Sequence, residues 1–346
     1  MQRQTLHTFL DNEIAEYGLD PKLSQLIINI SETCKEISFE VSCGDVAGVL
    51  GVAGSTNVQG EVQKQLDVIC NDLMVKGCIR SGCVCGMASE EMETSLPVPA
   101  YLPVGPYLVT FDPLDGSSNI DINISISTLF SILPSPHGAT HDISDIDFLQ
   151  PGINQVAAGY VVYGPQTTMA LTLGRGVVMF TLDPASNHFI FTKSESIIPR
   201  EAHEFAINCS NMRHWTEPVH RYITELLEGT TGPRGKDFNM RWIASMGAEV
   251  HRILSRGGIF MYPWDKRMTD RPGKLRLMYE ANPMGFLVEQ AGGMCTDGHE
   301  RILEIQPEKL HQRIPVFLGA AEEVERVTRY ITEAEADKDE KVAESK

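Results

Sequence analysis

The chain has 346 residues, of which 42% are hydrophobic and 22% are charged, the usual balance of a folded protein with a sizeable core. Its net charge of −17 argues against general binding to nucleic acid or to an anionic membrane, because both carry negative charge. No apolar run approaches the roughly 18 residues of a membrane span, and no signal peptide is evident, so we expect a cytoplasmic protein. The cysteine cluster at Cys78, Cys83 and Cys85 lacks the paired spacing of a zinc ribbon and is interpreted as reduced thiols, with no redox role assigned.

The first 76 residues favour helices around a flexible loop. Apolar residues recur at helical spacing over 8–17 and 23–41 and predict two amphipathic helices. A glycine-rich loop follows over 44–55, a composition typical of a loop that folds over a ligand. We expect a third helix over 61–76, with Glu61, Lys64 and Asp67 near one face. That face either looks inward or is solvated, and the pattern alone leaves both readings open.

Two predicted strands end in carboxylates. An apolar stretch over 83–89 ends in Glu90 and Glu91, and a second over 107–111 leads to Asp112, where Pro113 should stop the strand. A single acidic residue at a strand end is ordinarily a solvated loop residue. Several such groups gathered in one region would repel one another unless cations neutralised them, so we favour a shared cation site.

The residues after Pro113 extend this hypothesis to a phosphate. The backbone carbonyl of Leu114 and the side chain of Asp115 offer the hard oxygen ligands that magnesium prefers. Gly116, Ser117 and Ser118 then offer backbone N–H groups and hydroxyls to an anion. A hydroxyl-capped turn is the plain structural alternative for this string.

The remaining patterns divide the chain. Short strands with tight turns over 123–133 and 156–182 predict an antiparallel meander. Strand and helix patterns alternate after a boundary near 192–199, which favours an α/β second half. We therefore predict an α/β (α+β) protein with an N-terminal domain over 1–197, a C-terminal domain over 198–332 and a flexible charged tail over 333–346.

A basic segment in the second half fits an anionic substrate. Residues 264–276 hold five basic and two acidic side chains within a strongly acidic chain. The alternative is a solvated basic loop, although Tyr262 and Gly273 suit a segment that shapes a ligand site. The basic residues are Lys266, Arg267, Arg271, Lys274 and Arg276.

Together these motifs closely resemble class I fructose-1,6-bisphosphatase, within the magnesium-dependent, lithium-sensitive sugar and inositol phosphatases. The resemblance covers nearly the whole chain, and the stretch over 273–284 points to the bisphosphatase within that wider group. It implies a two-domain, layered α-β-α-β-α sandwich. It also implies a phosphoric monoester hydrolase that converts fructose 1,6-bisphosphate to fructose 6-phosphate and inorganic phosphate. The stretches that carry it are 54–61, 64–67, 89–91, 112–121, 156–160 and 273–284.

The resemblance also implies a cofactor and its ligands. Two or three Mg²⁺ ions per subunit are expected, and Mn²⁺ is expected to substitute for them. Glu61 matches a position, aspartate in many relatives, that helps to bind a further cation. Glu91 matches a residue implicated in activating water, and Asp67 matches a residue that supports it. The resemblance therefore implies in-line attack by a metal-activated water. The other implied metal ligands are Glu90, Asp112, the carbonyl of Leu114, Asp115 and Glu280.

Two phosphate subsites follow from the same resemblance. The 1-phosphate is expected on Asp115, Gly116, Ser117 and Ser118. The 6-phosphate is expected on further polar residues, with an arginine reaching across a subunit interface in a homotetramer. These positions are Asn208, Arg241, Tyr262 and Lys274, with Trp242 placed where many relatives have tyrosine. The cations of the family's AMP site are replaced near Pro106 and Pro134, so weak or absent AMP inhibition is expected.

Two alternatives stay open at this point. Trp242, and Asn211 in place of another tyrosine, leave room for a sedoheptulose-1,7-bisphosphatase or a dual sugar bisphosphatase. Outside enzymes, the carboxylates would suit an inactive cation-binding or scaffold protein. The sequence does not distinguish a gluconeogenic role from one in carbon fixation.

Overall fold

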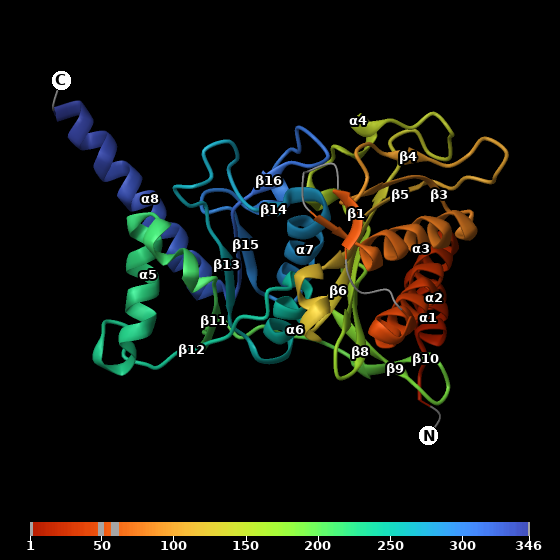
Figure 1. Ribbon diagram of the computed structural model, residues 1–346, viewed down its shortest axis with the longest axis horizontal. Coiled ribbons are helices and arrows are strands. Elements are labelled where there is room, and N and C mark those ends of the chain that lie inside the picture. Colours follow the sequence, from red (N-terminus) through yellow and green to blue (C-terminus); the bar gives the residue numbers. More distant parts are fainter. Residues whose placement is uncertain (1–2, 48–51, 57–61, 345–346) are drawn as a thin grey trace.

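The computed structural model describes residues 3–47, 52–56 and 62–344, which form five alternating layers of helix and sheet (Figure 1). Three N-terminal helices cover one face of an eight-stranded sheet, and α6 and α7 lie between this sheet and a five-stranded one. Helices α5 and α8 cover the outer face of the second sheet. The layered sandwich expected from the resemblance is confirmed. The helices are α1 (Leu6–Tyr17), α2 (Pro21–Cys43), α3 (Gln65–Ser81), α4 (Asp145–Phe148), α5 (Glu217–Glu228), α6 (Met246–Arg256), α7 (Asn282–Gln290) and α8 (Ala321–Glu344).

The eight-stranded sheet has the order β10-β9-β8-β7-β6-β5-β3-β4. Each neighbouring pair is antiparallel except β3 and β5, which run parallel. The expected antiparallel meander corresponds to β6 through β9, in which each strand pairs with the next along the chain. The strands are β3 (Val84–Ser89), β4 (Leu96–Pro97), β5 (Tyr107–Asp115), β6 (Ile126–Pro134), β7 (Ala157–Tyr163), β8 (Thr167–Thr172), β9 (Val178–Asp183) and β10 (His188–Lys193).

The five-stranded sheet has the order β12-β11-β13-β17-β15 and mixes parallel and antiparallel pairs. Two small antiparallel pairs complete the described strands. One of them, β14 with β16, sits between the large sheets and carries part of the candidate site. The bounds are β11 (Glu204–Ala206), β12 (Asn239–Met240), β13 (Ile259–Tyr262), β15 (Met294–Thr296), β17 (Val316–Gly319), β14 (Leu275–Arg276), β16 (Arg313–Ile314), β1 (Val52–Thr56) and β2 (Val62–Lys64).

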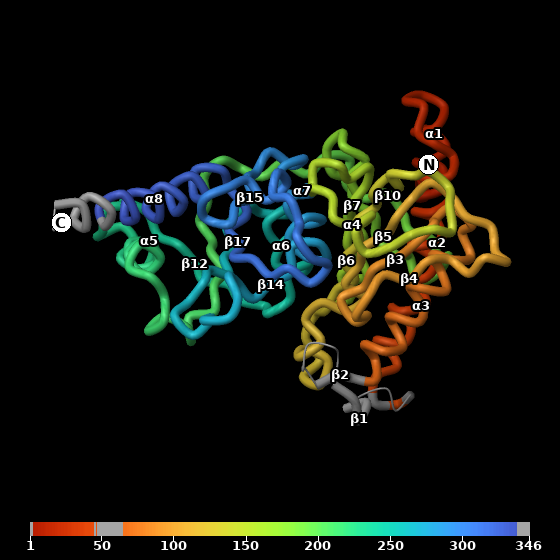
Figure 2. The backbone as a smooth tube through the Cα atoms, turned by 90° about the horizontal axis from the view of Figure 1, so that it is seen from above, coloured from red at the N-terminus to blue at the C-terminus, as the bar shows by residue number. Residues whose placement is uncertain are grey.

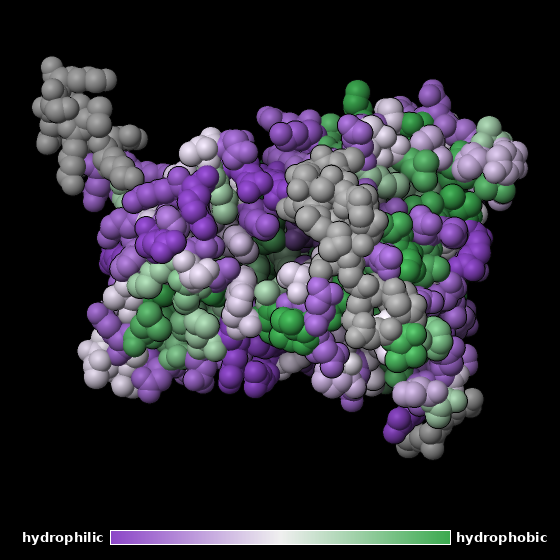
Figure 3. All heavy atoms as spheres, in the orientation of Figure 1, coloured by the Kyte–Doolittle hydropathy of each residue, from purple (hydrophilic) through white to green (hydrophobic). Residues whose placement is uncertain are grey.

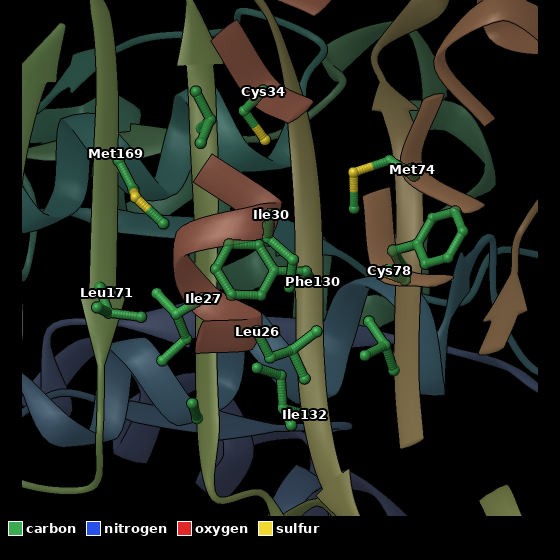
Figure 4. Packing of buried hydrophobic residues seen from close by; sticks show 14 of the residues in the cluster. Leu26, Ile27, Ile30, Cys34, Met74, Cys78, Phe130, Ile132, Met169 and Leu171 are labelled. Atoms are coloured by element: carbon green, nitrogen blue, oxygen red, sulfur yellow. The ribbon is translucent and has the colours of Figure 1, made fainter. Parts of the chain in front are cut away.

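Helix α2 shows how the sequence pattern builds the first layer. The Asp20 side chain accepts a hydrogen bond from the Lys22 N–H at 2.9 Å, and Pro21 opens the helix where its missing N–H is harmless. Leu26 and Ile30 then recur on one face and pack with Phe130 of β6 in a fully buried cluster (Figure 4). Burying each such side chain stabilises the fold by about 1.5–3 kcal/mol, so this face fixes α2 on the sheet.

Strand β5 does not end at Pro113, as we expected, but continues to Asp115. The neighbouring strand β3 has already ended at Ser89, and the pairing with β6 shifts between Asp112 and Asp115. No regular ladder bond from position 113 is therefore required, so proline is tolerated there. The Pro113 carbonyl instead accepts a hydrogen bond from the Thr128 hydroxyl at 2.9 Å.

The helix expected from residue 61 begins later. Residues 62–64 form β2, which pairs with β1, and α3 starts only at Gln65. The expected helical face shared by Glu61, Lys64 and Asp67 is therefore wrong, because strand pairing overrides the local helical preference. Glu61 itself, and residues 48–51 of the expected glycine-rich loop over 44–55, lie outside the described residues. The rest of that stretch is not loop, because Gly44–Ala47 form a 3₁₀ helix and β1 begins at Val52.

The two ends of the described chain lie at opposite ends of the molecule (Figures 1 and 2). The charged segment after residue 332, which we expected to be a flexible tail, continues α8 as far as Glu344. Alanine, glutamate and lysine are strong helix formers, and they dominate this segment. None of the described helices has the length and apolar character needed to span a membrane.

Candidate active site

A cavity of about 370 Å³ opens between the two halves of the molecule. Figure 3 shows the surface hollowed near the middle of the face, between these halves. Among the described residues, the cavity gathers side chains from positions that are as many as 213 residues apart in sequence, from Asp67 to Glu280. The expected site residues that line it are Asp67, Glu90, Glu91, Asp112, Leu114, Asp115, Gly116, Ser117, Ser118, Asn208, Trp242, Tyr262, Lys274 and Glu280.

The parallel pairing of β3 and β5 explains why two distant acidic stretches meet. Ser89, the last residue of β3, is paired with Phe111 in the middle of β5, and the Glu90 N–H donates to the Phe111 carbonyl at 3.1 Å. The residues that follow this pair, Glu90 just after β3 and Asp112 within β5, therefore lie side by side where β3 ends. The Leu114 N–H donates to the Asp112 carboxylate at 3.0 Å and fixes the turn of the chain after it.

Three buried carboxylates form the centre of the site. Oxygens of Asp112, Asp115 and Glu280 all lie within 4.8 Å of one another. Burial, followed by the charges of Glu90, Asp115 and Glu280, raises the pKa of Asp112 well above its usual value. Burial also raises the pKa of Glu280 to about 8, although the Arg276 cation opposes this shift. Such a cluster favours either protons or a cation over three free negative charges.

Glu280 reaches this cluster through an irregular helical turn. Residues Leu277–Ala281 form a π-helical turn directly before α7, and Glu280 is 4% exposed within it. The Glu280 carboxylate accepts a hydrogen bond from the Arg276 N–H at 2.6 Å. Turns of this kind occur often at functional sites, and this one directs Glu280 toward Asp112 across the domain boundary we expected.

Arg276 plays a different part from the one its sequence context indicated. We counted it with the cations that attract phosphate, but its guanidinium forms an ion pair with Glu90 at 2.5 Å and is buried. Arg276 thereby links β14 to the end of β3 and offsets one of the gathered negative charges. Of the five basic residues in 264–276, only Lys274 and Arg276 line the cavity, and Arg267 forms an ion pair with Asp265 at 2.7 Å.

Asp115 is held by the N-terminus of α6. Its Oδ2 atom accepts hydrogen bonds from the hydroxyls of Ser127 and Ser245, both at 2.6 Å, and from the Gly247 N–H at 3.0 Å. Its Oδ1 atom accepts from the Met246 N–H at 3.1 Å. A carboxylate is favoured at a helix N-terminus, where N–H groups lack partners within the helix. These contacts join β5 of the first half to α6 of the second.

The chain directly after Asp115 forms a tight turn at Gly116. Gly116 has φ +80°, a conformation that L side chains rarely adopt, and a Cβ there would lie 2.6 Å from the Cβ of Ser245. Ser117 begins a short 3₁₀ turn, Ser117–Ile122, and Ser117 and Ser118 both line the cavity. Glycine is therefore required both by the backbone and by the closeness of α6.

The far end of the cavity is aromatic and polar. Trp242 stacks on Phe260 with ring centroids 6.0 Å apart and an interplanar angle of 3°, and its ring lies 6.2 Å from that of Tyr262. Asn208 caps a 3₁₀ turn, its side-chain oxygen accepting from the Ser210 N–H at 3.2 Å. Lys274 brings a cation to the same wall.

Among the described residues expected at the site, Arg241 does not line this cavity. Glu61 lies outside the described residues. Arg241 has a side chain that is 48% exposed, and its guanidinium lies 3.5 Å from the Glu204 carboxylate. Glu91 is half-buried and Asp67 lies buried in the first turn of α3. Five further lining residues had no site role assigned from the sequence, namely Ala244, Ser245, Met246, Phe260 and Leu275.

The donor set fits a hard divalent cation. All three clustered groups are carboxylates, and no sulfur or imidazole ligand joins them among the described residues. Oxygen-only ligands are typical of Mg²⁺, Mn²⁺ and Ca²⁺ sites. Burial and the neighbouring carboxylates raise the pKa values of Asp112 and Glu280, and a bound cation would offset this cost of their ionised forms.

Comparison with known proteins places both halves of the chain in one family. Residues 4–194 match the model of the fructose-1,6-bisphosphatase N-terminal domain, and residues 198–332 match that of its C-terminal domain. The holo form of Leishmania major fructose-1,6-bisphosphatase superposes with a TM-score of 0.89 at 34% identity, covering 95% of this chain and 99% of that one. The apo form of the same enzyme gives a TM-score of 0.84 at 33% identity, with the same coverage. The chain belongs to the fructose-1,6-bisphosphatase family.

Proposed function

We propose that this cavity hydrolyses the 1-phosphate of fructose 1,6-bisphosphate, giving fructose 6-phosphate and inorganic phosphate. The observation that carries the proposal is the cluster of Asp112, Asp115 and Glu280 beside the Gly116 turn. A carboxylate cluster that attracts cations and a turn that accepts an anion share one wall. This combination is what metal-dependent phosphate hydrolysis requires.

The cofactor we propose is Mg²⁺, at two or three ions per subunit, with Mn²⁺ able to substitute. Asp112, Asp115 and Glu280 would hold it, together with Glu90 and the Leu114 carbonyl. When bound, Mg²⁺ supplies Lewis-acid polarisation of the phosphate and lowers the pKa of water. Glu61 is proposed for a further cation on the strength of the family resemblance alone.

The chain's own residues then position the reactants. Ser117 and Ser118 would bind the oxygens of the 1-phosphate, and Glu91 would accept the proton of the attacking water. Asp67 is proposed to support Glu91 from the first turn of α3. Attack in line with the departing sugar oxygen needs no covalent enzyme intermediate.

The 6-phosphate would bind at the aromatic end of the cavity. Lys274 supplies a cation there, and Asn208, Tyr262 and the indole N–H of Trp242 supply donors. Arg241, which does not line its own cavity and has a half-exposed side chain, is proposed to reach the site of a neighbouring subunit in a homotetramer. We further propose that the enzyme works in the cytoplasm.

A panel of substrates tests this function. Phosphate release is expected from fructose 1,6-bisphosphate in the presence of Mg²⁺, and far more slowly from fructose 6-phosphate and inositol 1-phosphate. Sedoheptulose 1,7-bisphosphate belongs in the same assay, because Trp242 and Asn211 stand where many relatives have tyrosine and leave this sugar open as a substrate. Cation binding without phosphate release from any of these compounds would contradict the proposal and support a scaffold protein.

A further inference from the structure

The serine on β6 that faces Asp115 has no role in the function proposed so far. Ser127 is paired with Asp115 in the register of β5 and β6, and its side chain is fully buried. Its hydroxyl lies 2.6 Å from Asp115 Oδ2 and 3.1 Å from the Ser245 hydroxyl. Three polar side chains from three different elements therefore meet at one buried point.

The direction of these hydrogen bonds follows from the number of available protons. An ionised carboxylate only accepts, and each serine hydroxyl has one proton to give. Both hydroxyl protons must therefore point at Oδ2, and the 3.1 Å approach of Ser127 to Ser245 is a consequence of sharing that acceptor. The Ser245 oxygen accepts in turn from the Ala248 N–H at 3.4 Å, as the N-cap of α6.

This arrangement distinguishes the two oxygens of Asp115. Within the described part of the chain, Oδ2 receives three donors, from Ser127, Ser245 and Gly247, whereas Oδ1 receives one, the Met246 N–H. A carboxylate oxygen has about two lone-pair sites, so Oδ2 is filled and Oδ1 retains capacity for a cation.

The donors also oppose a repulsion. Asp115 lies within 4.8 Å of two further carboxylates, which would push its charge away from the cluster if its side chain were free to turn. Donors on the opposite side hold it in place, and a ligand fixed in advance loses little freedom when the cation binds.

We propose that Ser127 is a positioning residue for the cation site. Together with Ser245 and the Gly247 N–H it occupies Oδ2 of Asp115, and Oδ1, which accepts one hydrogen bond from the Met246 N–H, keeps capacity for the cation. The inference rests on the proposed function, because it takes Asp115 as a cation ligand. It adds that cation affinity depends on the seating of α6 against β6, since the donors come from both elements.

The test is a titration of the full-length protein with Mn²⁺, in which electron paramagnetic resonance measures the bound and free ion. Hydrolysis of fructose 1,6-bisphosphate is measured in parallel. Ser127→Ala is expected to raise the dissociation constant of Mn²⁺ by about 3- to 20-fold, which is less than the full loss of one hydrogen bond to a charged group because this bond is made with and without the cation. The Mg²⁺ concentration for half-maximal activity should rise by a similar factor.

Ser131→Ala is the matched control. Ser131 is a buried serine on the same face of β6, paired with Thr110 rather than with Asp115. It is expected to leave Mn²⁺ affinity within about twofold of the wild type, since it does not contact the cluster. If Ser127→Ala melts far below the control, Ser127→Cys replaces it in the test, because cysteine keeps the volume but is only a weak donor. Ser127→Cys should show the same loss of Mn²⁺ affinity.

The outcomes separate the two proposals. Wild-type Mn²⁺ affinity in Ser127→Ala or Ser127→Cys, in an enzyme that still hydrolyses the substrate, overturns the role of Ser127 alone. A wild-type protein that neither binds Mn²⁺ nor releases phosphate contradicts the proposed function, and this inference with it. Equal losses in Ser127→Ala and Ser131→Ala would show a general packing effect and would also overturn the positioning role.

Discussion

At the scale of single residues, the site is a balance between buried carboxylates and whatever neutralises them. Asp112 and Glu280 are both buried and both have raised pKa values, while Arg276 forms an ion pair with Glu90. A cation must therefore compete with protons for the same oxygens. That competition makes cation binding depend on pH in a direction fixed by the sign of the shift.

The first prediction concerns this pH dependence. Glu280 has a pKa of about 8 in the folded, cation-free protein, so cation binding below that pH must displace a proton. Mn²⁺ affinity should rise as the pH goes from 6.5 toward 8, by up to about tenfold per unit, and then level off. Titration calorimetry in buffers of different ionisation enthalpy should detect the released proton. Affinity that stays constant over this range would contradict the account.

The folded protein without cation should show the reverse trend. A carboxyl whose pKa is raised on folding stabilises the fold fully below its unfolded pKa, and this contribution is lost as the pH rises through the folded value. The free energy of unfolding should thus fall between about pH 4.5 and 8, the range spanned by the usual and raised pKa of Glu280. Adding Mg²⁺ should restore more stability at pH 8 than at pH 6.

A second residue-scale prediction concerns the proposed proton acceptor. Glu91→Gln should lower kcat by about 10²- to 10⁴-fold, the usual contribution of general base catalysis, with little change in product inhibition by phosphate. Glu93→Gln is the control, because Glu93 is exposed and is absent from the cavity lining. Near-normal turnover in Glu91→Gln would remove Glu91 from the mechanism.

At the scale of elements, the N-terminus of α6 must come unusually close to β6. A Cβ at Gly247 would lie 2.3 Å from the Ser127 hydroxyl and 2.8 Å from a terminal methyl of Leu129. Helical alanine is otherwise favoured over glycine by about 1 kcal/mol, so the packing decides the sign. This closeness lets the Gly247 N–H reach Asp115.

Gly247→Ala is therefore expected to lower the free energy of unfolding by about 1–3 kcal/mol, as overpacked substitutions do. In a Ser127→Gly background the main clash is gone and the Leu129 side chain can shift, so the same change should be neutral or stabilising. Urea denaturation of the four proteins measures this coupling. Additive effects of the two substitutions would show that the residues do not contact each other.

Several elements could be predicted from local patterns, and others could not. Helix α2 has both a cap and an apolar face in its sequence, and β3, which ends at Ser89, has an apolar run. By contrast, β5 continues through Pro113 because β3 has already ended and the pairing with β6 shifts at this point, so no ladder bond from Pro113 is needed. Strand β2 depends on its pairing with β1. The ion pair of Arg276 with Glu90 joins residues 186 positions apart, which a local pattern does not reveal.

At the scale of the whole molecule, the site belongs to both halves. Asp112 and Asp115 lie in β5 of the first sheet. Glu280, Lys274 and the α6 N-terminus belong to the second half of the chain. The motif around Asp115 indicated the metal site from sequence alone. Its supporting groups, Ser127, Ser245 and the Gly247 N–H, are ordinary small residues whose role depends on the docking of the halves.

Arg241 extends the argument to the proposed tetramer. Since its side chain does not line its own cavity, Arg241→Ala should raise the KM for fructose 1,6-bisphosphate by about 10-fold or more, as for loss of a charged contact. Mixed tetramers of Arg241→Ala and Glu280→Gln subunits should regain activity that neither variant has alone at low substrate. No recovery after subunit mixing would show that Arg241 does not serve a neighbouring site.

The central claim is that a cluster of carboxylates makes this protein a metal-dependent fructose-1,6-bisphosphatase. The most direct test is a steady-state assay of phosphate release from fructose 1,6-bisphosphate after removal of divalent cations by chelation, with Mg²⁺ then added back. The account predicts negligible release without the cation, full recovery with Mg²⁺, and one phosphate released per fructose 6-phosphate formed. Undiminished release from the chelated protein, or no release at any Mg²⁺ concentration, would contradict it.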